Sequence, residues 1–126
     1  MPNPIFVFGS NETGIHGAGA ATDAYQKHGA LWGIGEGYQG SSYAIPTKDH
    51  NIKTLPLRSV KWYVKRFLNF AKGFPQLTFR VTQIGCGLAG FTPDKIAPMF
   101  RRAPSNRQFS SAWAEWLPNR QYWTDK

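Results

Sequence analysis

Cysteine is almost absent from this sequence, and long apolar runs are absent altogether. Cys86 is the only cysteine among 126 residues, so no disulfide can form within the chain, and a reducing compartment is expected. No stretch of 18 or more apolar residues occurs, which argues against a transmembrane helix and a membrane partner. The opening MPNPIFVFGS lacks the basic start and cleavage site of a secretory signal, so we expect a cytoplasmic protein.

Patterns that hold metals or build familiar catalytic triads are also lacking. His28 and His50 have no cysteine or carboxylate partners at ligand spacing, so the sequence predicts neither a metal site nor a bound cofactor. No Ser-His-Asp order and no pair of carboxylates can be recognised from spacing alone. If the protein is an enzyme, its chemistry must come from other groups.

Acidic residues are scarce and unevenly placed. The formal net charge is +8, with 15 Lys and Arg against 7 Asp and Glu. Residues 1–50 hold two basic and four acidic groups, whereas residues 51–126 hold thirteen basic and three acidic groups. Such asymmetry favours anionic partners such as nucleotides or nucleic acid, although a plain solvated basic surface explains it equally well.

Apolar periodicity and turn residues divide the chain into alternating strands and helices. The clearest helix follows Pro56, because Val60, Val64, Phe67 and Ala71 fall on one face of it. The predicted elements are strand 4–9, helix 17–28 closed by Gly29, loop 29–41, strand 42–47, helix 57–72, strand 77–84, helix 93–100 with Thr92 as N-cap, and a C-terminal helix carrying Phe109, Trp113, Trp116 and Leu117.

This alternation predicts one α/β domain over residues 1–126, with a mainly parallel sheet between two helical layers. In such sheets, ligands bind outside the carboxyl ends of the strands. Two glycine-rich segments leave from such ends, one after Phe8 and one after Ile84. Backbone amides without a Cβ nearby can approach phosphate closely, so the two loops together could close on one diphosphate.

Two segments match the dinucleotide fingerprint GxGxxG in their letters but not in their place along the chain. Residues 35–40 match GxGxxG but precede a strand, and residues 85–90 match it with only 36 residues remaining. An ordinary Rossmann unit is therefore not expected.

The two loops do resemble those of another nucleotide-binding family. GSN at residues 9–11 followed by HGAGAATDAYQKHGA at 16–30 resembles the first loop and helix of macrodomains, and IGCGLAGFTP at 84–93 is similar to their second loop. The resemblance covers roughly residues 5–102, looks closest to short macro-like proteins of phages and bacteria, and leaves residues 105–126 outside as a C-terminal helix or tail. It implies a macrodomain-like three-layer fold that binds ADP-ribose or a related nucleotide.

The resemblance also implies roles for individual residues. Asn11 matches the asparagine that orients the distal ribose, and Phe91 matches an aromatic that packs on that ribose. Apart from the resemblance, hydrolysis would need a water held by Asn11, His16 or the substrate's own phosphate. The ribose and diphosphate loops correspond to Gly17, Ala18, Gly19, Gly87, Leu88, Ala89 and Gly90. The family's adenine-recognising aspartate has no clear match, since Glu12 and Asp23 are only neighbours.

Simpler interpretations stand beside these. Asn11 can be a turn residue, His16 an ordinary loop histidine, Phe91 a core residue and Cys86 a small buried residue. Three functions therefore stay open: an ADP-ribose-related hydrolase, a protein that sequesters an NAD-derived signal without turnover, and a basic module that binds single-stranded nucleic acid.

Overall fold

A six-stranded sheet organises the chain, as a computed structural model that describes residues 4–103 and 106–124 shows. The strand order is β2-β3-β1-β4-β5-β6, so β1 (Ile5–Asn11) lies between β3 (Ser42–Lys48) and β4 (Phe79–Val81). All neighbouring pairs are parallel except β2 (Gly37–Gln39) with β3. The predicted mainly parallel α/β sheet is therefore confirmed.

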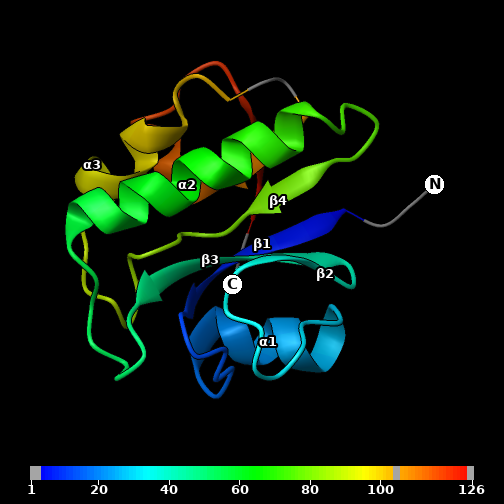
Figure 1. Ribbon diagram of the computed structural model, residues 1–126. Helices are drawn as coiled ribbons and strands as arrows, with labels where there is room; N and C mark the ends of the chain where they lie inside the picture. The colour runs from blue at the N-terminus through cyan, green and yellow to red at the C-terminus, as the bar shows by residue number, and fades with distance from the viewer. Residues whose placement is uncertain (1–3, 104–105, 125–126) are drawn as a thin grey trace.

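Helices cover both faces of this sheet (Figure 1). Successive side chains of β1 point to opposite faces, so they pack into two separate hydrophobic cores. Ile5 and Val7 join the larger core under α2 (Leu57–Lys72), whereas Phe8 joins a smaller core under α1 (Gly19–Lys27). Burial on two faces also explains β3, whose first six residues are all buried.

Helix α2 has the predicted bounds, and its four predicted core residues are all buried. Phe67 lies 4.9 Å from Tyr43 of β3 and 5.4 Å from Phe79 of β4, measured between ring centroids. Such edge-to-face contacts join helix and sheet beyond the area they bury.

Helix α1 begins two residues later than predicted and ends at Lys27, with His28 as its C-cap. Gly29 follows in the left-handed region at φ +77°, and a Cβ there would lie 3.0 Å from Gly40 Cα. Glycine is therefore needed at position 29, where the chain leaves α1 and passes close to the backbone of Gly40. The predicted loop 29–41 thus contains a short strand that sequence periodicity did not reveal.

The predicted C-terminal helix is wrong. Residues 107–123 form β5 (Arg107–Ser110), a single 3₁₀ turn at Ser111–Trp113 and β6 (Gln121–Trp123), which extend the sheet in parallel. The aromatic spacing had suggested a helix because Phe109 and Trp113 both face the core, but one does so from a strand and the other from the turn. These residues belong to the same sheet as the rest of the chain.

Two other elements are shorter than predicted. Strand β4 covers only Phe79–Val81 of the predicted 77–84, and the predicted helix 93–100 splits into α3 (Pro93–Ile96) and a 3₁₀ turn at Ala97–Phe100. Pro98 explains the split, because it lacks the N–H that an α-helix would use. Thr92 is the N-cap as predicted, although its hydroxyl bonds Asp94 rather than a backbone N–H.

Trp113 provides a test of the C-terminal packing. Its side chain is fully buried, with its ring 5.6 Å from that of Phe100, so Trp113→Ala should lower the free energy of unfolding by about 3–5 kcal/mol. Trp32→Ala is the control, because Trp32 is 55% exposed and the loss of its edge-on contacts with Tyr25 and His16 should cost only about 1 kcal/mol. Denaturant unfolding measures both, and equal costs would contradict the described core.

Candidate functional site

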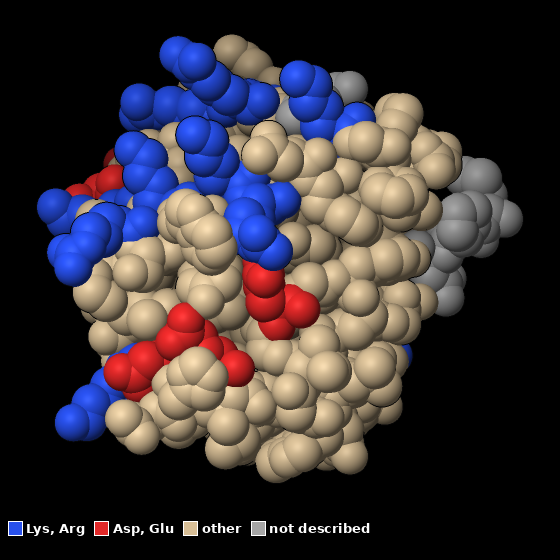
Figure 2. Space-filling model, in the orientation of Figure 1, with Lys and Arg blue, Asp and Glu red and all other residues tan. Residues whose placement is uncertain are grey.

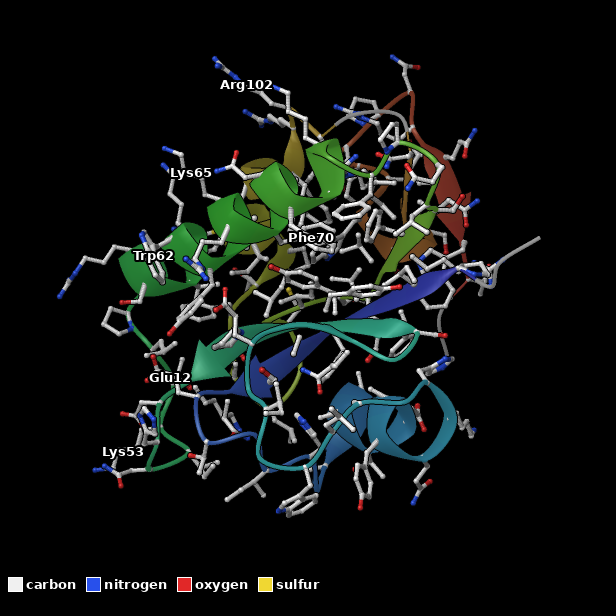
Figure 3. The ribbon with its side chains drawn as sticks, turned by 45° about the vertical axis from the view of Figure 1, so that its right-hand side comes forward. Glu12, Lys53, Trp62, Lys65, Phe70 and Arg102 are labelled. Carbon is white, nitrogen blue, oxygen red and sulfur yellow. The ribbon has the colours of Figure 1, made fainter. Side chains whose placement is uncertain are left out.

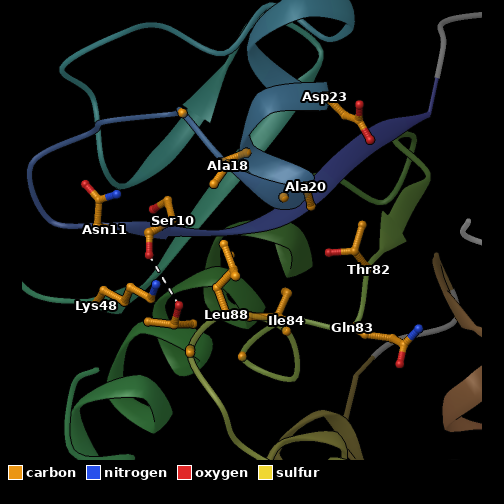
Figure 4. A pocket seen from close by; sticks show the side chains of 18 of the residues that line it. Ser10, Asn11, Ala18, Ala20, Asp23, Lys48, Thr82, Gln83, Ile84 and Leu88 are labelled. Atoms are coloured by element: carbon orange, nitrogen blue, oxygen red, sulfur yellow. Dashed lines mark hydrogen bonds between the residues drawn. The ribbon is translucent and has the colours of Figure 1, made fainter. Parts of the chain in front are cut away.

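A cavity of about 880 Å³ opens at the carboxyl ends of β1, β3 and β4 (Figure 4). Its place follows from the chain path. The loop after β1 leads to α1 on one face of the sheet, whereas the loop after β4 leads to α3 on the other face. Neighbouring loops that leave in opposite directions open a crevice between their strands, which is where ligands bind in α/β sheets.

The first wall of the cavity is the segment that leads into α1. Gly17, Ala18, Gly19, Ala20 and Ala21 all line the cavity. The first N–H groups of a helix have no intrahelical acceptors, and Ala18 at the N-cap provides no side-chain cap. The start of α1 thus presents backbone donors and a positive dipole end to the cavity.

The opposite wall is the loop after β4, and Gly85, Gly87, Leu88 and Ala89 line it. Gly85 has φ +76°, and a Cβ there would lie 3.3 Å from Ile96, so this tight turn requires glycine. At Gly87 nothing lies within 4 Å of a built Cβ, which leaves the backbone open to a ligand.

Leu88 brings the two walls close together. Its side chain is 68% exposed, and its Cδ1 would lie 3.7 Å from a Cβ built at Gly19. Figure 4 shows it between the two loops. The predicted ligand loops, 17–19 and 87–89, therefore face each other across one cavity.

Asn11 lies at the cavity, but its side chain also holds its own loop. The Nδ2 group donates to the carbonyl of Ile15 at 2.8 Å, and Oδ1 accepts from the Ile15 N–H at 3.0 Å. The residue is only 7% exposed. An amide has a second N–H and a second acceptor lone pair, so one donor and one acceptor site remain beyond these bonds.

His16, the other predicted catalytic residue, lies outside the cavity lining. It is 1% exposed, and its Nε2 lies 2.9 Å from the carbonyl of Leu31 and 3.1 Å from that of Ile34. Two carbonyl acceptors require Nε2 to donate, which fixes the tautomer. The ring also packs edge-on against Phe8, so His16 joins the 31–34 loop to β1.

Gly90 and Phe91 likewise lie outside the cavity lining. The Gly90 N–H donates to the Gly87 carbonyl, the Phe91 N–H donates to the Gly85 carbonyl at 2.8 Å, and the Phe91 ring packs against the larger core. Both residues therefore stabilise the loop through these contacts and do not face the cavity.

Two charged side chains line the cavity among the described residues, Lys48 and Asp23. Figure 4 shows them at opposite ends, with Lys48 near Asn11 and Asp23 on the same side as Thr82 and Gln83. Lys48 directly follows the predicted strand 42–47, so its place at the carboxyl end of a strand could have indicated that it lines the site. The sequence did not single out Asp23 as a lining residue, because it lies on a helix rather than in a loop.

Glu12, the other acidic neighbour of the first strand, is directed away from the cavity. Its carboxylate accepts a hydrogen bond of 2.5 Å from the hydroxyl of Tyr63 on α2, and Figure 3 shows it on the side of α2. Burial raises the pKa of Tyr63 to about 12, so this hydroxyl stays protonated and keeps donating at neutral pH.

Cys86 lies within the second loop, yet its thiol is directed to the core. Its Sγ donates to the Ile84 carbonyl at 3.6 Å, and it packs against the larger core. Burial raises the pKa of this thiol to about 11, which leaves little thiolate at neutral pH. Cys86 is thus a packing residue in this structure.

Asn11→Ala tests the loop-holding bonds. The N–H and carbonyl of Ile15 would lose their partner, so the free energy of unfolding should fall by about 1–3 kcal/mol. Asn69→Ala, an exposed change on α2, should cost about 0.5 kcal/mol or less. If thermal and denaturant unfolding show no difference between the two variants, the Asn11 side chain does not hold the loop.

The described residues contain no cluster of three His, Cys, Asp or Glu side chains that could hold a metal ion. None of the described helices combines the length and apolar character needed to cross a bilayer. Comparisons of the chain with models of protein families, with curated proteins and with solved structures find no match. The function must therefore be inferred from the geometry of the cavity itself.

Proposed function

We propose that the protein binds ADP-ribose or a closely related NAD-derived nucleotide in the cavity between the two glycine-rich loops. The observation that carries the proposal is their convergence: residues 17–19 and 87–89 are about 70 residues apart in the sequence and line the same cavity. The macrodomain-like arrangement that their sequences resemble is part of the same proposal.

The diphosphate would lie between the two walls. The start of α1 supplies backbone donors and its positive dipole end, and the open backbone at Gly87 faces it from the other side. Lys48 and Asp23 lie near the two ends, so no carboxylate among the described lining residues opposes an anion in the middle.

The remaining groups suit the sugars and the base. Asn11 keeps one donor and one acceptor site, which fits a ribose diol at the Lys48 end. Asp23 at the other end offers an acceptor for the base, and Trp123 lines the cavity as an aromatic wall. A volume of about 880 Å³ lies in the usual range for small-molecule sites.

Binding is better supported than turnover. Asp23 and Lys48 are the charged side chains among the described lining residues, and His16 lies outside the lining. Sequestration of an NAD-derived signal therefore needs no further group. Hydrolysis of an ADP-ribosyl bond or an ADP-ribose phosphate at the Asn11 end needs a water held by Asn11 or by the substrate's own phosphate, because the Asp23 carboxylate lies at the opposite end of the cavity.

Titration calorimetry with ADP-ribose tests the binding, with AMP and ribose 5-phosphate as half-ligands. We expect ADP-ribose to bind more tightly than either half, because only the whole molecule spans the cavity. Equal affinities for ADP-ribose and AMP would contradict the two-ended site. Incubation followed by chromatography of the nucleotide then separates sequestration, which returns ADP-ribose intact, from hydrolysis.

Charge substitutions at Gly87 test where the diphosphate lies. The position is exposed, has no atom within 4 Å of a built Cβ and does not need a positive φ, so Gly87→Glu and Gly87→Lys should both fold. A carboxylate beside the diphosphate should weaken ADP-ribose binding by about 100-fold or more, as repulsion of about 4 kcal/mol per charge pair near a protein surface allows.

Gly87→Lys is the control of similar length and opposite charge. It should keep affinity within about fivefold of the parent, since attraction offsets crowding. Equal losses in both variants would mean that the loop forms a wall without facing an anion. Parent-like binding by Gly87→Glu would remove the diphosphate from this loop.

A further inference from the structure

The outer side of α2 is a cationic stripe that the nucleotide cavity does not use. Helix α2 contains five Lys and Arg residues and no Asp or Glu. Four of the cations share one side with Trp62 and Asn69, at the spacing of successive helical turns, and all six are exposed. We name this set the α2 stripe: Arg58, Lys61, Trp62, Lys65, Asn69 and Lys72.

Further cations continue the α2 stripe beyond the helix. The 3₁₀ turn before Arg101 packs against α2, with the rings of Phe100 and Phe67 6.3 Å apart. Arg101 and Arg102 follow that turn and are exposed. Figure 3 shows Trp62, Lys65 and Arg102 all projecting away from the sheet, and Figure 2 shows the Lys and Arg side chains gathered over the α2 side.

Trp62 places an aromatic ring among these charges. It is 55% exposed and lies 5.0 Å from the ring of Tyr63. The guanidinium of Arg66 lies 4.9 Å from the indole centroid and is held there by Glu36 at 2.6 Å. An exposed indole carrying a fixed guanidinium is a surface on which a base can stack.

We propose that the α2 stripe binds single-stranded nucleic acid, as a second site independent of the nucleotide cavity. The 16-residue helix is about 24 Å long at 1.5 Å per residue. Arg58, Lys61 and Lys65 lie about one turn apart, which suits a backbone that runs along the helix, with Trp62 available to one base.

An anionic membrane fits this surface less well. A helix that lies in a bilayer interface must bury its apolar face in lipid. The apolar face of α2 is already buried in the core through Val60, Val64 and Phe67. Long cationic side chains and a single indole remain, which suits phosphates in solution.

The experiment is fluorescence anisotropy of a labelled 15-nucleotide oligo(dT), at 50 to 200 mM salt. Lys61→Gln/Lys65→Gln should weaken binding about tenfold at 50 mM salt and lower the slope of log affinity against log salt by about 1.4, which is about 0.7 for each lost contact. Trp62→Ala should weaken it about tenfold with the slope unchanged, because stacking releases no counterions.

The matched control is Lys27→Gln/Lys53→Gln, which removes the same charge at two exposed positions outside α2. It should bind oligo(dT) within about twofold of the parent. Equal losses in the two double variants would overturn the proposal, because net charge alone would then explain binding. An unaffected Trp62→Ala, or tighter binding of a DNA duplex than of oligo(dT), would overturn its single-stranded part.

Misfolding, coupling to the nucleotide cavity and membrane binding are each tested separately. Circular dichroism melting must show that each variant is folded, and each should bind ADP-ribose like the parent, since no α2 stripe residue lines the cavity. Dissociation constants for vesicles of phosphatidylserine and phosphatidylcholine come from sedimentation. Tighter binding to these vesicles than to oligo(dT), together with its loss in Trp62→Ala, would assign the surface to membranes and overturn the proposal.

Discussion

The parallel pairing of β1 with β3 on one side and β4 on the other is the constraint on which the site depends. It brings the ends of three strands to one edge, and the connections after β1 and β4 leave it toward opposite faces. The cavity is therefore a consequence of the topology. Gly19 and Gly85 both have a positive φ, +61° and +76°, which L side chains rarely adopt, so the backbone path of each wall favours glycine.

Two different forms of anion recognition follow from this arrangement. In the cavity, donors are backbone groups at the start of α1 and the open loop at Gly87, and only one lysine, Lys48, joins them among the described lining residues. On the outer side of α2, the donors are long cationic side chains around Trp62. Fixed amides suit one small ligand of defined shape, whereas flexible lysines suit a polyanion whose register can vary.

The sequence predicted the sheet class, the bounds of α2 and the meeting of the two glycine loops, because these depend on local periodicity and on backbone demands that only glycine meets. It did not predict β5 and β6, whose strand pairing is long-range and whose aromatic spacing imitates a helix. At the site, Asn11 and residues 17–19 and 87–89 line the cavity, whereas His16, Gly90 and Phe91 lie outside its lining. The direction in which a loop side chain points depends on packing partners that are distant in sequence, such as the carbonyls of Leu31 and Ile34 for His16.

The most direct test of a nucleotide site between the two loops is a map of the amide signals of ¹⁵N-labelled protein during titration with ADP-ribose. Backbone donors that bind a diphosphate change their shifts strongly. We expect the largest changes to fall together on residues 17–21 and 85–89, with smaller changes at Asn11 and Lys48 and none along the outer side of α2. Changes confined to one of the two loops, or centred on α2, would contradict a nucleotide site formed by their convergence.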